Sequence, residues 1–222
     1  MKIAVLGTGV VGQTLAEKLI SLDHQVWIGT RDVTETLNRE AFKNWHLQNH
    51  KVQLGTFAEV VGGAELIFNA VQGAVAVLTL DSCSKSDFDD KIIIDVSNPL
   101  DFSKGFPPSL IDGLSNTHSL GEEIQGVLPN AKVVKTLNTM WCELMVNPHL
   151  VNNGQHTNFI CGNDANAKET VVGLLQSFGW KKENILDLGD IENARGTEAT
   201  LLIWIRIYGA RKSGAFQFNI VQ

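Results

Sequence analysis

A glycine-rich turn near the amino terminus constrains the fold more than any other feature of this chain. Residues 7–12 read Gly-Thr-Gly-Val-Val-Gly, directly after the apolar run 2–6 and before segment 13–22, whose apolar residues recur at helical spacing. In this setting the first glycine permits a tight turn, the second lets backbone approach a phosphate, and the third lets helix and strand pack closely. The pattern predicts a dinucleotide-binding unit with a pyrophosphate at the helix amino terminus.

Apolar runs rich in β-branched residues alternate with amphipathic segments along most of the chain. This alternation predicts right-handed βαβ units and an α/β fold of the Rossmann type, with a doubly wound parallel sheet. Strands are expected at 2–6, 25–29, 52–54, 65–71, 91–96, 131–137, 157–161, 185–188 and 216–221. Helices are expected at 13–22, 35–46, 57–61, 73–80, 119–128, 165–178 and 191–208, and a surface loop at 102–116.

The length of 222 residues leaves room for one domain with an elaboration, and none for two full-sized domains. A weak boundary lies at Asn152-Asn-Gly154. We therefore predict a dinucleotide-binding Rossmann domain at 1–150 and a small C-terminal α/β lobe at 151–222 that completes the substrate site.

Charge and composition exclude several classes of partner. The chain has 18 Lys and Arg against 24 Asp and Glu, so it has no bulk positive field to attract nucleic acid or anionic lipid. No apolar run is long enough for a membrane span and no signal peptide fits, and three scattered cysteines suit a reducing compartment. The histidines show no metal-ligand spacing. We expect a cytoplasmic protein that binds no nucleic acid, membrane or metal.

The end of the second predicted strand bears on the choice of nicotinamide cofactor. NAD enzymes usually place Asp or Glu there, whereas this chain has Gly29, Thr30 and Arg31. A hydroxyl and a guanidinium suit the 2′-phosphate of NADP, because arginine pairs with phosphate through two parallel hydrogen bonds. Asp32 follows, and its carboxylate would either neutralise Arg31 or hold a ribose hydroxyl.

Many segments beyond the turn match one family of enzymes. They lie at 2–12, 28–31, 95–100, 118–123, 133–140, 162–164, 178–180, 187–191, 194–198 and 218–221. Over nearly its whole length the chain resembles the bacterial branch of the NADP-dependent oxidoreductases of the coenzyme factor 420 type. The archaeal relatives pass hydride between NADPH and an 8-hydroxy-5-deazaflavin. The resemblance therefore implies hydride transfer between NADPH and a flavin-like acceptor, either the deazaflavin coenzyme factor 420 or a flavin.

The resemblance also implies a set of residues that bind NADP(H). For the pyrophosphate they are Gly7, Thr8, Gly9, Val10, Val11 and Gly12, and for the 2′-phosphate Thr30 and Arg31. Ala70 and Val71 would line the adenosine side, Ser97, Asn98 and Pro99 the nicotinamide ribose, and Asn138 and Thr139 the nicotinamide and second substrate. Of further basic residues that follow the arginine, Arg39 is the nearest.

No catalytic side chain is predicted, because hydride transfer between two stacked rings depends on positioning and the cofactors carry the chemistry. His118 is either an ordinary loop histidine, which we favour, or a residue at the edge of the substrate pocket. Lys135 lies within a strand and suits a structural role, and Trp141 is the tryptophan best placed for stacking. Two alternatives stay open: a β-hydroxyacid or imine dehydrogenase-like enzyme, and a non-catalytic redox sensor that binds NADP(H). Helix 197–208 with the glycine-rich 209–214 is a candidate homodimer surface.

Overall fold

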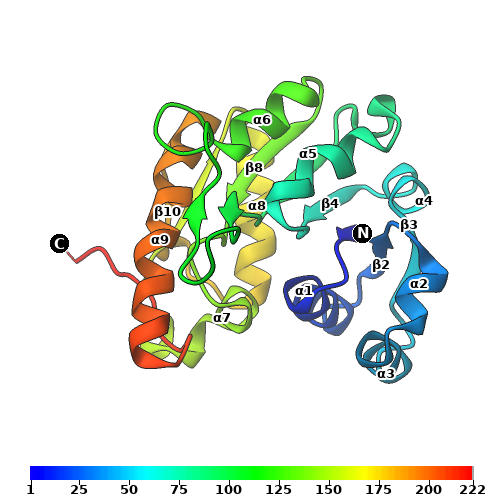
Figure 1. Ribbon diagram of the computed structural model, residues 1–222, viewed down its shortest axis with the longest axis horizontal. Coiled ribbons are helices and arrows are strands. Elements are labelled where there is room, and N and C mark those ends of the chain that lie inside the picture. Colours follow the sequence, from blue (N-terminus) through cyan, green and yellow to red (C-terminus); the bar gives the residue numbers. More distant parts are fainter. Residues whose placement is uncertain (222) are drawn as a thin grey trace.

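The computed structural model describes residues 1–221 and contains a large sheet with helices on both faces (Figure 1). The strands are β1 (Lys2–Leu6), β2 (Gln25–Thr30), β3 (Gln53–Thr56), β4 (Leu66–Asn69), β5 (Ile92–Asp95), β6 (Leu100–Asp101), β7 (Ser109–Leu110), β8 (Lys132–Thr136), β9 (Asn158–Gly162) and β10 (Ile185–Asp187). The α-helices are α1 (Val10–Ser21), α2 (Val33–Asn38), α3 (Glu40–Gln48), α4 (Phe57–Gly62), α5 (Gly73–Asp81), α6 (Leu120–Val127), α7 (Cys142–Val146), α8 (Ala165–Phe178) and α9 (Ala194–Arg211).

The order of the strands confirms the predicted Rossmann-type sheet. The sheet has 8 strands in the order β10-β9-β8-β5-β4-β1-β2-β3. From β3 to β8 all neighbours are parallel, whereas β9 is antiparallel to β8 and β10 is parallel to β9. The parallel part has the strand order of the dinucleotide-binding fold, in which β1 and β4 flank the switch point where ligands bind.

Strand β1 shows why the parallel strands read as continuous apolar runs. Ile3 and Val5 belong to the core beneath α1, α3, α7 and α8, whereas Ala4 and Leu6 belong to the core beneath α4, α5 and α6. All four side chains are fully buried. Because both faces of the sheet are covered by helices, no strand position in the centre can be polar without a buried partner.

Several predicted elements differ from the structure. The helix expected at 35–46 is divided into α2 and α3 by Arg39, whose backbone is extended. The strand expected at 216–221 is wrong: this segment forms no ladder, and its backbone bonds are isolated contacts such as Thr157 N–H to the Phe218 carbonyl. The loop expected at 102–116 contains one strand of the short β6–β7 pair. Helix α7 was not expected, nor were the short 3₁₀ turns at 85–88, 148–150, 152–154 and 182–184.

Residues after 151 extend the main sheet. Strand β9 pairs with β8 and β10 pairs with β9, and α9 lies at the end of the molecule opposite α2 and α3 (Figure 1). The division into 1–150 and 151–222 stays a prediction, and residue 222 lies outside the described residues. Within residues 1–221 no helix has both the length and the apolar composition that crossing a membrane requires. Cys83, Cys142 and Cys161 are buried and free.

His156 gives the fold a predictable dependence on pH. Its ring is 1% exposed, packs edge-on against Trp180, and donates from Nε2 to the Pro148 carbonyl at 2.9 Å. Burial lowers the pKa of His156 below its ordinary value of about 6.5. The unfolded chain therefore takes up its proton at a higher pH than the folded chain does, so stability is lost as the pH falls below about 6.5.

We expect His156→Gln to flatten the fall in unfolding free energy between about pH 7 and about pH 5. Urea unfolding at several pH values measures this slope. His50→Gln is the matched control, because His50 is exposed. An unchanged slope in His156→Gln would contradict the assignment.

Candidate functional site

The three glycines of the turn have different structural roles. Gly7 has a φ of +117°, and a Cβ placed on it would lie 2.7 Å from the carbonyl oxygen of Ala70. A Cβ on Gly12 would lie 2.1 Å from the carbonyl oxygen of Gly7, which is closer than any real contact. A Cβ on Gly9 would meet nothing within 4 Å. The fold itself therefore requires Gly7 and Gly12, whereas Gly9 leaves open space in front of the turn.

The amino terminus of α1 faces this open space without a cap. Gly9 is the N-cap residue, no side chain accepts from the first backbone N–H groups, and the first turn holds no acidic residue. Helix α5, which begins after Gln72, is uncapped in the same way. Side chains cap α2, α4, α6 and α8, and α3 and α7 have an acidic residue in the first turn, whereas α9 is uncapped like α1 and α5. Free N–H groups and the helix dipole at α1 suit an anion such as a pyrophosphate.

A pocket of about 300 Å³ lies at the carboxyl ends of β1, β4 and β5. Its lining includes seven residues of the predicted cofactor set, namely Gly9, Val10, Val11, Ala70, Val71, Ser97 and Asn98. The lining also includes residues that were not predicted, namely Gln72, Gly73, Ala74, Val96, Leu100 and Phe102. The pocket therefore occupies the switch point at which dinucleotides bind in this fold.

Thr30 and Arg31 lie outside this pocket, at the end of β2. The Thr30 hydroxyl is buried and 2.7 Å from that of Thr36. The Arg31 side chain is 85% exposed. Its Nη2 lies 3.9 Å from the Glu35 carboxylate, which is a long distance for an ion pair. The Asp32 carboxylate accepts from the Glu35 backbone N–H at 2.7 Å and so caps α2. Arg31 is therefore available to a ligand, and Asp32 is occupied by its own helix.

Arg39 joins the glycine-rich turn at 7–12 to the end of β2. Its Nη2 donates to the Thr8 hydroxyl at 2.8 Å and to the Thr36 hydroxyl at 3.0 Å. This contact brings a second guanidinium between the turn and Thr30. Arg39 was named in the sequence as a nearby basic residue, but the break between α2 and α3 that turns it toward Thr8 was not expected.

Five residues of the predicted set are buried and do not line the pocket, namely Gly12, Thr30, Pro99, Asn138 and Thr139. Asn138 Nδ2 donates to Asn98 Oδ1 and Asn98 Nδ2 donates to the Asn138 carbonyl, each at 2.9 Å. Asn138 therefore holds the orientation of Asn98, which does line the pocket.

His118 is engaged in an ionic cluster at the start of α6. Its Nε2 lies 2.9 Å from Glu123 and its Nδ1 3.5 Å from Glu122, while Arg195 makes two hydrogen bonds to Glu122. Burial opposes ionisation of Glu122, but the bonds from Arg195 and Ser119 outweigh it and lower the pKa of this carboxyl. His118 is thus placed by carboxylates and does not line the pocket. No group of acidic, histidine and cysteine side chains within residues 1–221 is arranged to hold a metal ion.

Gly9 provides a direct test of the pocket. We expect Gly9→Val to fold with an unchanged melting temperature, because its Cβ enters open space and its φ of −76° suits any residue. The same side chain would occupy the position of the pyrophosphate, so we expect NADPH affinity to fall by about 100-fold or more. Calorimetric titration measures the affinity.

Gly63→Val is the matched control for this variant. Gly63 also has nothing within 4 Å of its Cβ position, but it lies between α4 and β4, at the amino ends of the strands. Unchanged NADPH affinity in a folded Gly9→Val protein would show that the cofactor binds elsewhere.

Comparisons with known proteins identify relatives of this chain. Residues 2–99 match the family described as NADP oxidoreductase, coenzyme F420-dependent. The chain is 28% identical over 201 residues to the metalloreductase STEAP3 of Rattus norvegicus, with 89% of this chain and 36% of that protein aligned. The chain thus spans about a third of the length of this curated relative.

Solved structures extend the comparison over the whole chain. A candidate F420-dependent NADP-reductase from Arthrobacter sp. FB24 is 49% identical, with 100% of both chains covered and a TM-score of 0.96. A reductive aminase from Aspergillus terreus in complex with NADPH shares the fold at 16% identity and a TM-score of 0.64, covering 95% of this chain and 62% of that one. The chain belongs to the family of coenzyme F420-dependent NADP oxidoreductases, and it is an NADP-dependent oxidoreductase with a Rossmann-like fold.

Proposed function

We propose that this protein transfers hydride between NADPH and a flat, ring-shaped acceptor of the deazaflavin or flavin class. NADPH supplies the hydride from its nicotinamide ring, and the acceptor ring takes up the hydride with its electron pair. The chain has to hold the two rings in contact, exclude water from between them, and keep the charged end of the cofactor in place.

The shape of the site supports one orientation of the cofactor. The uncapped amino terminus of α1 suits the pyrophosphate, and the exposed guanidinium of Arg31 beside β2 suits the 2′-phosphate of the adenosine ribose. These two positions direct the remaining half of the molecule along the pocket toward Ser97 and Asn98, at the end of β5. Leu100, which also lines the pocket, would then border the nicotinamide ring, and Phe102 would face the acceptor.

The proposal about the acceptor rests on the position of Phe102 in the pocket. Its side chain lines the pocket and yet is 57% exposed, which leaves an aromatic face available to a ligand. The β6–β7 pair and the bonds from Ser103 to Asp101 fix the loop that bears it. None of the described residues that line the pocket is acidic, basic or a thiol. An aromatic wall without a general acid suits ring-to-ring hydride transfer, in which positioning supplies the rate.

We expect oxidation of NADPH, followed by its absorbance, with oxidised coenzyme factor 420 or FMN as acceptor, and no oxidation with simple ketones or cyclic imines. Turnover with the imines and not with the ring acceptors would replace the proposal by the imine dehydrogenase-like alternative. Tight NADPH binding without turnover on any acceptor would favour the redox sensor.

Substitution of two phenylalanines in the same loop distinguishes an effect on acceptor binding from an effect on loop stability. Phe102→Ala should raise the KM for the ring acceptor by about tenfold while leaving NADPH affinity unchanged, because a stacked aromatic pair contributes about 0.5–1.5 kcal/mol beyond its area. Phe106→Ala is the matched control, since Phe106 is 61% exposed but does not line the pocket. Equal KM values in the two variants would contradict the acceptor site.

The two arginines near β2 should determine the preference for NADPH over NADH. A hydrogen bond to a charged group contributes about 1.5–3 kcal/mol, so Arg31→Ala and Arg39→Ala should each weaken NADPH by roughly 10- to 150-fold. NADH lacks the 2′-phosphate, so its dissociation constant should change by less than about threefold. Calorimetry with both cofactors measures the ratio.

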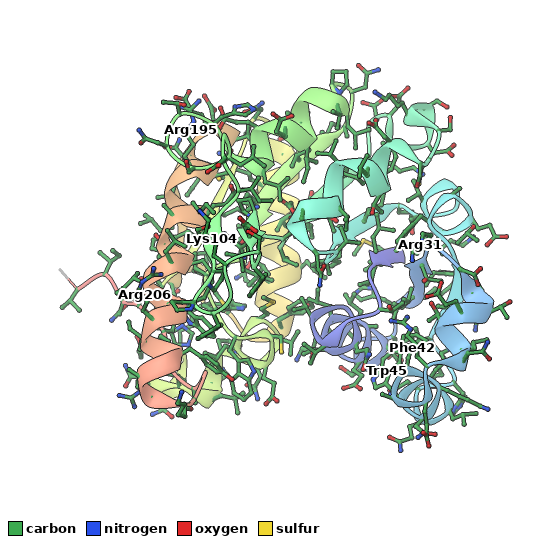
Figure 2. All side chains as sticks on the ribbon, in the orientation of Figure 1. Arg31, Phe42, Trp45, Lys104, Arg195 and Arg206 are labelled. Atoms are coloured by element: carbon green, nitrogen blue, oxygen red, sulfur yellow. The ribbon has the colours of Figure 1, made fainter. Side chains whose placement is uncertain are left out.

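Arg206→Ala is the matched control for the arginine variants. Arg206 lies on α9, on the opposite side of the molecule from Arg31 in Figure 2. Losses of equal size for NADPH and NADH in Arg31→Ala and Arg39→Ala would refute the 2′-phosphate role of both residues.

A further inference from the structure

Three charged side chains meet inside the molecule, away from solvent. Lys135 on β8 and Asp95 at the end of β5 are fully buried, and Glu198 on α9 is 1% exposed. The Lys135 ammonium donates at 2.7 Å to each of three oxygens: Asp95 Oδ2, Glu198 Oε1 and the Ser97 carbonyl. All three N–H bonds of the ammonium are therefore used. We call Lys135, Asp95 and Glu198 the buried triad.

The buried triad carries a net charge of −1, and backbone dipoles compensate for it. The Asp95 carboxylate also accepts from the Ser97 backbone N–H, the Ser97 hydroxyl and Asn69 Nδ2. The Glu198 carboxylate accepts from the backbone N–H groups of Leu120 and Gly121, at 3.0 and 3.1 Å, in the first turn of α6. The partial positive charge of a helix amino terminus suits a carboxylate.

The three oxygens around the Lys135 ammonium favour the ionised form of this lysine. Burial by itself lowers the pKa of Lys135, but the charges of Asp95 and Glu198 outweigh burial and raise it. Ion pairs of this kind add little net stability over an apolar core, because desolvation offsets the attraction. A role in placing particular groups accounts better for such a costly arrangement, and the groups that this triad places can be read from its bonds.

Those groups are Ser97, which lines the pocket, and the start of α6, which packs against the lining residue Gly73. Lys135 and Asp95 together hold the carbonyl, the N–H and the hydroxyl of Ser97, which with Asn98 lines the pocket. Gly73, at the start of α5, packs closely against both Asn98 and α6. A Cβ placed on Gly73 would lie 2.0 Å from the Asn98 carbonyl and 2.9 Å from the Leu120 side chain. Glu198 thereby links α9 to the α5 and α6 side of the pocket.

We propose that Lys135 and Glu198 are positioning residues, which fix the Ser97–Asn98 wall and so place the nicotinamide half of NADPH for hydride transfer. This inference rests on the proposed function only for the location of the nicotinamide. The adenosine half would bind across β1, at Arg31 and Arg39, and none of the bonds of the triad reaches these residues.

Two ligands that share the adenosine half test this division. Adenosine 2′,5′-bisphosphate carries the 2′-phosphate without the nicotinamide, and NADPH carries both. In Glu198→Gln we expect NADPH to bind about tenfold more weakly and kcat with coenzyme factor 420 or FMN to fall about tenfold or more. The affinity for adenosine 2′,5′-bisphosphate should change by less than about twofold.

Glu192→Gln is the matched control. Glu192 precedes α9 and pairs with Arg195, outside the buried triad, and this variant should leave both affinities and kcat unchanged. If Glu198→Gln fails to fold, Glu198→Asp keeps the charge and shortens the side chain by one methylene, and it should show the same division with a smaller loss.

Three outcomes would overturn the proposal: equal losses for both ligands, a lowered melting temperature with both affinities and kcat unchanged, or the same losses in Glu192→Gln. Failure of the proposed function is distinguishable from these. In that case the wild-type protein would reduce no ring acceptor, while the comparison of NADPH with adenosine 2′,5′-bisphosphate would still give a result for the triad.

Discussion

The contact between Gly12 and the carbonyl of Gly7 is the constraint on which the rest of the site depends. With 2.1 Å between that oxygen and a hypothetical Cβ, only glycine lets α1 start so close to the end of β1. This close approach points the free N–H groups of α1 toward the switch point of the sheet. At that point the strand order reverses, with β2 on one side of β1 and β4 on the other. Gly7 also comes close to the carbonyl of Ala70, and this contact joins the glycine-rich turn to the next wall of the pocket.

The parts of the fold that depend on local pattern could be predicted from the sequence. Strand β1, the glycine turn and helix α8 follow from apolar periodicity and glycine spacing, and their predicted and observed bounds agree closely. The direction of β9 could not be predicted, because apolar content does not distinguish a parallel from an antiparallel neighbour in a covered sheet. Segment 216–221 has the composition of a strand, but no strand edge pairs with it in a regular ladder.

The residues of the candidate site also fall into those that the sequence could place and those that it could not. Gly9, Ala70, Val71, Ser97 and Asn98 could be placed from the sequence, because each follows the end of a parallel strand. Phe102, Arg39 and the partners of Lys135 could not. Their positions depend on a loop, on a helix break and on α9 folding back over α6, and none of these leaves a local pattern. Position within a strand predicts a structural role for Lys135 but gives no indication that its ammonium reaches Ser97.

These features describe one site with two halves of different construction. The end near α1 and β2 consists of backbone N–H groups and exposed guanidinium groups, which suit a charged ligand that has to dissociate. The end near Ser97 is held by buried ionic and amide pairs, which suit a ring that must keep one orientation. This arrangement is consistent with an enzyme that exchanges its cofactor in each turnover and relies on geometry for the chemical step.

Isotope transfer tests the central claim most directly. NADPH labelled with deuterium at the transferring position of the nicotinamide would be mixed in a single turnover with oxidised coenzyme factor 420, and the reduced product analysed by mass spectrometry. A deazaflavin accepts hydride at a ring carbon, so our account predicts that the label passes to the acceptor and remains there. Reduced acceptor without deuterium, formed in ordinary water, would contradict direct hydride transfer between two rings held in this pocket.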